Sequence, residues 1–167
     1  GLQAVEIPRD ERPAQNLVFL IDVSGSMDMP NKLPLVKRAF QLLIDELSEK
    51  DTVSIVTYAS MDEVVLDGVP ASEKTTIMAA IDSLAAGGMT AGAAGITTAY
   101  ELAAKHFIPG GNNRVLLATD GDNNGSNSGS FHRDVPVDLA TRFPGRVSLL
   151  TVEDYLAISP PEKPSFT

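Results

Sequence analysis

Two uninterrupted apolar runs constrain the fold of this chain more than any other feature. Residues 17–21 read Leu-Val-Phe-Leu-Ile, and residues 115–118 read Val-Leu-Leu-Ala. A strand with one solvated face alternates apolar and polar residues, whereas an unbroken run of this length is typical of a strand buried on both faces of a parallel sheet. Asp22 follows the first run directly, and Asp120 follows the second after one threonine. The sequence therefore predicts two buried strands that each end at a carboxylate.

The segments between these runs predict helices that alternate with further strands. Residues 32–47 place apolar side chains at spacings of three and four, which is the pattern of an amphipathic helix. Alternation of this kind favours an α/β fold, a Rossmann-like three-layer α/β/α arrangement with a mostly parallel central sheet. We expect helices at 32–47, 73–84 and 91–107, and strands at 2–7, 17–21, 53–58, 63–66, 114–119 and 147–152, with Asp67 and Gly68 as a turn after the fourth of these strands.

Composition excludes several classes of function. The chain has 167 residues, the size of one domain, and a formal net charge of −9. This charge argues against a nucleic-acid partner, because no basic surface is available for phosphates. There are no cysteines, which excludes disulfides and zinc–thiolate sites. No apolar run reaches the length of a membrane span, so we expect a soluble monomer without membrane insertion. The chain begins with Gly1 and carries no visible signal sequence, so we expect a piece of a longer protein.

Three short segments predict one metal site. Asp22, Ser24 and Ser26 follow the first buried strand, Thr90 follows a glycine pair, and Asp120 follows the other buried strand. In parallel α/β sheets, ligands bind beyond the carboxyl ends of the strands. Carboxylates and hydroxyls are hard oxygen ligands that suit Mg²⁺ or Mn²⁺ rather than zinc. With only two carboxylates, the ion would keep positive charge and an exchangeable position, which a carboxylate from another molecule could fill.

In this order, the three segments resemble a von Willebrand factor type A domain with its metal-ion-dependent adhesion site. The resemblance covers residues 1–125, and the stretches 17–27, 87–95 and 112–122 are most similar to a bacterial branch found in cell-surface or periplasmic proteins. It implies Asp22, Ser24, Ser26 and Thr90 as direct ligands and Asp120 as a ligand through water. It further implies Mg²⁺, or else Mn²⁺ or Ca²⁺, and a protein partner that presents an Asp or Glu carboxylate. The resemblance implies a binding and adhesion module at the cell surface or in the periplasm, and not an enzyme.

The C-terminal part departs from this resemblance. Such a domain normally continues after Asp120 with two more helix–strand units, but residues 126–167 do not resemble the family. We therefore expect one domain over residues 1–158, family-like to residue 125 and divergent over 126–158, followed by an irregular tail at 159–167. The C-terminal third is expected to be incomplete or altered.

The same residues allow three alternative interpretations. Asp120, Asp122 and Asn124 match the start of an EF-hand calcium loop, but Phe131 stands where a bidentate Glu is needed. A Mg²⁺-dependent hydrolase or phosphotransferase could use Asp22 as a nucleophile, with Asp28 as the second carboxylate, but needs a well-placed Lys. A third possibility is a scaffold of this family that has lost its metal.

The two histidines and four of the methionines are the remaining residues considered for a role in binding. His106 lies near the end of a predicted helix and His132 lies in the divergent segment, and both are expected to be structural or solvated. Four methionines flank the predicted site and either pack locally or line a partner surface; they are Met27, Met29, Met61 and Met89.

Overall fold

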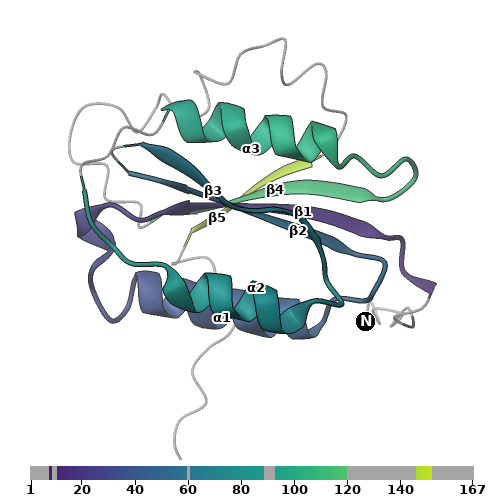
Figure 1. Ribbon diagram of the computed structural model, residues 1–167, viewed down its shortest axis with the longest axis horizontal. Coiled ribbons are helices and arrows are strands. Elements are labelled where there is room, and N and C mark those ends of the chain that lie inside the picture. The colour runs from purple at the N-terminus through teal and green to yellow at the C-terminus, as the bar shows by residue number, and fades with distance from the viewer. Residues whose placement is uncertain (1–7, 9–10, 60, 89–92, 120–145, 152–167) are drawn as a thin grey trace, which may run out of the picture.

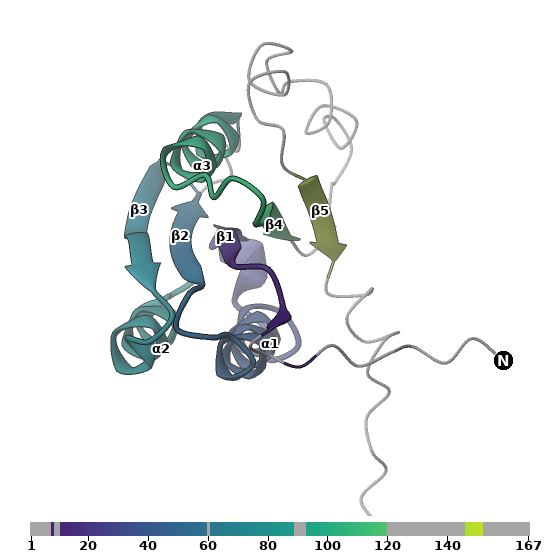
Figure 2. The same cartoon turned by 90° about the vertical axis from the view of Figure 1, so that its right-hand side faces the viewer.

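A single sheet organises the computed structural model, which describes residues 8, 11–59, 61–88, 93–119 and 146–151. Within these residues, five strands lie in the order β3-β2-β1-β4-β5 (Figure 2). β1 runs parallel to β2 and β4, β5 runs parallel to β4, and β3 alone is antiparallel to its neighbour. Their bounds are β1 (Gln15–Asp22), β2 (Thr52–Tyr58), β3 (Asp62–Pro70), β4 (Asn112–Thr119) and β5 (Arg146–Thr151).

Helices cover both faces of this sheet, which confirms the expected α/β/α layers. Figure 1 shows α3 on one face and α1 and α2 side by side on the other. The helical elements are η2 (Gly25–Met27), α1 (Leu33–Asp45), α2 (Lys74–Ser83) and α3 (Ala93–Lys105). Pro34 lies in the first turn of α1, where its missing N–H has no helical acceptor to lose.

The central position of β1 explains its unbroken apolar run. Phe19 and Ile21 belong to the core beneath α1 and α2, and Leu20 belongs to the core beneath α3. The Phe19 and Phe40 rings lie 4.3 Å apart between their centroids, which joins β1 to α1. Because successive side chains of a strand point to opposite faces, a strand between two helical layers must be apolar at every position.

The strand predicted at residues 63–66 is longer than its apolar pattern indicated. We expected it at residues 63–66 with a turn at Asp67 and Gly68, but β3 continues through both to Pro70. The pairing with β2 shifts register here, so Val53 pairs with Val69 while Ile55 pairs with Leu66. Gly68 has φ = +63° and donates its N–H to Ser54 Oγ at 2.9 Å. Asp67 and Gly68 therefore belong to an irregular, bulged part of β3 and do not form a turn, so this prediction is wrong.

The sheet continues beyond the segment that resembles the family. β5 pairs with β4 from Arg114–Arg146 to Thr119–Thr151, which confirms the strand expected at 147–152. The predicted strand at 2–7, most of the divergent segment and the tail at 159–167 lie outside the described residues. The predicted domain bounds, 1–158 with a tail, stay a prediction. In the part of the chain that the structure describes, no helix is long and apolar enough to cross a membrane.

Candidate metal centre

The parallel strands β1, β2 and β4 end side by side, and the candidate site lies at their carboxyl ends. Asp22, the last residue of β1, pairs with Tyr58 at the end of β2, and Ile21 pairs with Ala118 near the end of β4. The Asp22 side chain is buried, with 4% of its surface exposed. A carboxylate in this position has lost most of its water and needs donors or a cation in exchange.

The turn after β1 brings two serine hydroxyls together. The Ser24 N–H donates to Asp22 Oδ1 at 2.8 Å, and the Oγ atoms of Ser24 and Ser26 lie 3.0 Å apart. The short helix η2 follows, with the Met27 N–H donating to the Ser24 carbonyl at 2.9 Å. Met27 is fully buried and holds this turn against the core, whereas Ser26 is exposed. One buried carboxylate and two adjoining hydroxyls, one of them open to solvent, fit a Mg²⁺ ligand set.

The glycine pair before Thr90 is bonded to this turn. Gly87 donates its N–H to the Val23 carbonyl at 2.7 Å, and Gly25 donates its N–H to the Gly88 carbonyl at 3.1 Å. Gly88 has φ = +90°, a conformation that residues with a side chain rarely adopt. These two hydrogen bonds bring a segment some sixty residues distant along the sequence beside Ser24 and Ser26, as the sequence pattern predicted.

The five predicted ligands are thus only partly described. The structure brings together Asp22, Ser24 and Ser26, whereas Thr90 and Asp120 lie outside the described residues. Thr90 is two residues beyond Gly88, and Asp120 is the residue after Thr119, where β4 ends. Among the described residues, no group of three or more His, Cys, Asp or Glu side chains is placed to hold a metal. The hydroxyls of Ser24 and Ser26 are not side chains of these four types. The full ligand set stays a prediction.

A hydrogen bond beside the site was not predicted from the sequence. Asp62, the first residue of β3, accepts from Thr98 Oγ1 of α3 at 2.5 Å. This contact ties the start of β3 to the first half of α3. The two residues are 36 positions apart and neither belongs to a motif, so no local signal in the sequence indicated the pair.

The methionines divide between the two roles considered for them. Met27 is fully buried and packs locally, whereas Met29 is 50% exposed and Met61 is 82% exposed. Met89 lies outside the described residues. Local packing therefore accounts for Met27 but not for Met29 or Met61.

His106 belongs to an ion-pair cluster at the opposite end of α3. Its Nε2 atom lies 2.6 Å from Asp67 Oδ1, and Lys105 Nζ lies 2.6 Å from Asp67 Oδ2. Hydrogen bonds from Lys105 and then from His106 lower the pKa of the Asp67 carboxyl below its usual value of 3.8. The structural role expected for His106 is confirmed, since it joins α3 to the edge strand β3. His132 and the EF-hand-like segment from Asp120 to Phe131 lie outside the described residues.

Comparison with known proteins agrees with this architecture. A family model described as "von Willebrand factor type A domain" matches residues 17–123. An uncharacterized protein of Escherichia coli K12, YfbK, is 54% identical over 115 residues, which are 69% of this chain and 20% of that protein. The chain thus matches about a fifth of the length of that relative.

Two solved structures share the fold. The von Willebrand factor type A protein from Catenulispora acidiphila has a TM-score of 0.64 at 20% identity, covering 87% of this chain and 42% of that one. The vWF domain of the type V pili tip protein Mfa5 from Porphyromonas gingivalis has a TM-score of 0.58 at 17% identity, covering 65% and 38%. At these identities the likeness concerns the fold alone. The family model matches well over half of the chain, and this protein therefore belongs to the von Willebrand factor type A domain family.

Proposed function

We propose that this domain binds another protein through a divalent cation held at the carboxyl end of β1. The observation that carries the proposal is the buried Asp22 carboxylate beside the paired hydroxyls of Ser24 and Ser26, 3.0 Å apart. Thr90 and Asp120 would complete the set, Asp120 through water. Mg²⁺ is the expected ion, with Mn²⁺ or Ca²⁺ as substitutes, because every ligand is a hard oxygen.

The charge balance of this site supports a role in binding a partner. Three of the four proposed direct ligands are neutral hydroxyls, so Asp22 alone would place a negative charge directly on the doubly charged ion. The ion would keep an open position that attracts a further anionic oxygen. An Asp or Glu side chain of a partner protein supplies such an oxygen, and Ser26 is exposed at the edge where it would approach.

Surface location and lack of enzymatic activity belong to the same proposal. A similar fold occurs in the tip protein of a pilus, which supports, by analogy only, a parent protein located at the cell surface or in the periplasm. A hydrolase that uses Asp22 as its nucleophile is less well supported. Asp22 is 4% exposed and one of its oxygens accepts the Ser24 amide, which suits a fixed ligand better than a group that must reach a substrate.

Calorimetric titration of the chain with Mg²⁺, Mn²⁺ and Ca²⁺ tests the proposed metal site. We expect one ion per chain, and we expect Asp22→Ala and Asp120→Ala to abolish binding while the thermal melting curve in chelator stays cooperative. Asp82→Ala is the matched control, because Asp82 is an exposed carboxylate on α2 that accepts from Gln41. A titration without binding heat, together with an unchanged melting temperature in all three metals, would instead indicate a scaffold that has lost its ion.

A further inference from the structure

The end of the molecule that carries Asp22 also exposes two methionine side chains. Among the described residues, four large hydrophobic side chains are exposed, and two of them lie in loops at this end. Met61, in the turn between β2 and β3, is 82% exposed, and Met29, in the loop before α1, is 50% exposed. Flexible, polarisable methionine side chains exposed at this end are suited to an adaptable contact with a partner.

Backbone hydrogen bonds hold both methionine loops to the turn of the candidate metal centre. The Val23 N–H donates to the Tyr58 carbonyl at 3.1 Å, and the Ala59 N–H donates to the Met61 carbonyl at 3.1 Å. The Met29 N–H donates to the carbonyl of buried Met27 at 2.9 Å. The backbone on each side of the site is therefore fixed, whereas the two methionine side chains are free to adapt to a contact.

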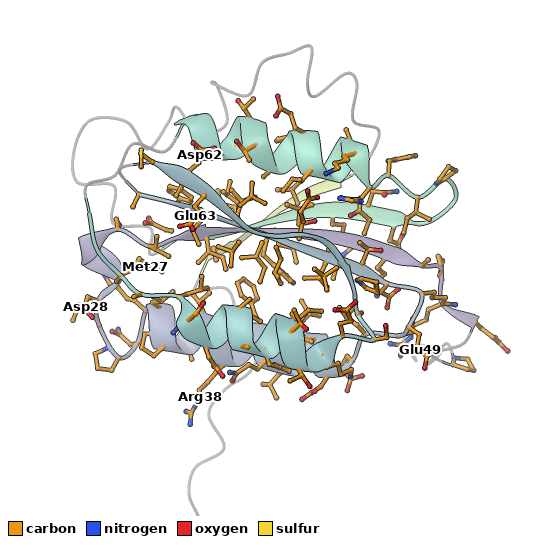
Figure 3. The ribbon with its side chains drawn as sticks, viewed as in Figure 1. Met27, Asp28, Arg38, Glu49, Asp62 and Glu63 are labelled. Atoms are coloured by element: carbon orange, nitrogen blue, oxygen red, sulfur yellow. The ribbon has the colours of Figure 1, made fainter. Side chains whose placement is uncertain are left out.

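Acidic side chains lie at the same end. Figure 3 shows Asp28, Asp62 and Glu63 at the same end of the molecule as Met27, with Glu49 at the far end. Asp28 and Glu63 are exposed, and Asp62 is engaged with Thr98. Half-buried Lys32, just before α1, offsets part of this charge. A partner that carried only negative charge would be attracted by the ion and repelled by this rim, which adds to the chain's net charge of −9.

We infer that the partner segment carries a single Asp or Glu flanked by Lys or Arg and by a large apolar side chain. The inference rests on the proposed function, because the carboxylate would bind the ion at Asp22. The basic side chains would face Asp28 and Glu63, and the apolar side chain would pack against exposed Met61. The acidic rim then discriminates against uniformly acidic segments, which the ion alone would accept.

Selection from a random dodecapeptide library displayed on phage tests this inference without a known partner. The chain is immobilised with Mg²⁺, and bound phage are eluted with EDTA. We expect the eluted peptides to be enriched in one Asp or Glu with Lys or Arg and a large apolar residue nearby. A selected peptide, resynthesised with Asn or Gln in place of the acidic residue, should lose binding.

Variants of the rim measure each contact separately. Met61→Ser should weaken a selected peptide about fivefold to tenfold, because a methionine side chain loses its buried contact. Asp28→Asn and Glu63→Gln should each weaken it about twofold to fivefold, and the effect should fade at high salt. Leu42→Ser and Glu49→Gln are the matched controls, since Leu42 is 61% exposed on α1 and Glu49 lies at the far end, and both should bind as the original chain does.

The outcomes separate this inference from the proposed function. Peptides that need Mg²⁺ and a carboxylate, but show no enrichment in basic or apolar residues, would leave the proposed function standing and overturn the inference. Equal binding by the Met61→Ser and Glu63→Gln chains would overturn it in the same way. A selection without any EDTA-eluted peptide would contradict the proposed function itself and, with it, the inference.

Discussion

The hydroxyl oxygens of Ser24 and Ser26 lie 3.0 Å apart, immediately beyond the carboxyl end of the central strand. The Ser24 amide is at the same time bonded to Asp22, so the carboxylate and both hydroxyls are held by five consecutive residues. In the proposed metal site these three side chains would need little rearrangement, because hydrogen bonds already hold them together.

Removal of one hydroxyl should weaken metal binding without unfolding the domain. We expect Ser26→Ala to lower Mg²⁺ affinity about tenfold or more, by analogy with the cost of losing an outer-shell partner of a metal site. Ser26 is exposed, so its removal leaves the core intact. Calorimetric titration measures the affinity and urea unfolding measures the stability. An affinity equal to that of the original chain would remove Ser26 from the ligand set.

Met27 and Met29 provide a matched pair for the role of packing beneath the site. Met27→Ala should lower the free energy of unfolding by about 2–5 kcal/mol, because it leaves a cavity in the core. Met29→Ala should change it by no more than about 0.5 kcal/mol, because the side chain is half exposed. Urea denaturation in chelator measures both. Similar losses in the two variants would contradict a buried Met27 and an exposed Met29.

The sequence predicted most of the strands but not every contact that joins them to the helices. The apolar run from 17 to 21 had only one reasonable structure, a strand buried on both faces, and β1 confirms it. The hydrogen bond from Thr98 to Asp62 was not predictable, since it depends on how α3 lies across β3. The length of β3 was missed for a similar reason, because Gly68 reads as a turn residue until Ser54 of the neighbouring strand is known to accept its N–H.

Asp51 is a second residue that local sequence did not single out. Its carboxylate is 3% exposed and accepts from the N–H groups of Gln15 and Ser48 and from the Ser48 hydroxyl. It lies just before β2, at the opposite end of the strands from the candidate metal centre.

Replacement of Asp51 should therefore affect stability and spare metal binding. Asp51→Ala leaves buried donors without an acceptor and should cost about 1–3 kcal/mol of unfolding free energy, or more. Mg²⁺ affinity should stay unchanged, because the site is at the other end of the strands. Asp82→Ala, an exposed carboxylate on α2, serves as the control. Loss of metal affinity in Asp51→Ala under conditions where the chain is folded would contradict this separation.

The cluster of Asp67, Lys105 and His106 should make stability depend on pH in the acid range. The partners lower the pKa of Asp67 in the folded state, so its contribution is present above the unfolded value near 3.8 and is lost as pH falls through the lower folded value. The side chain is 43% exposed, so solvent screening keeps the effect small. Asp67→Asn should flatten this part of the curve of unfolding free energy against pH. A curve of unchanged slope below pH 4 would show that the ion pairs contribute nothing.

Paramagnetic broadening by Mn²⁺ in amide NMR spectra locates a bound ion and so tests the metal centre proposed at the end of β1. We expect Mn²⁺ to broaden the amide signals of Asp22, Ser24 and Gly88 first, and excess Mg²⁺ to restore them. The amide signal of Asp51, at the opposite end of the strands, should stay sharp. In Asp22→Asn, the selective broadening should disappear. Broadening that centres on another acidic group such as Asp67, or that survives the Asp22 substitution, would contradict a metal centre at the end of β1.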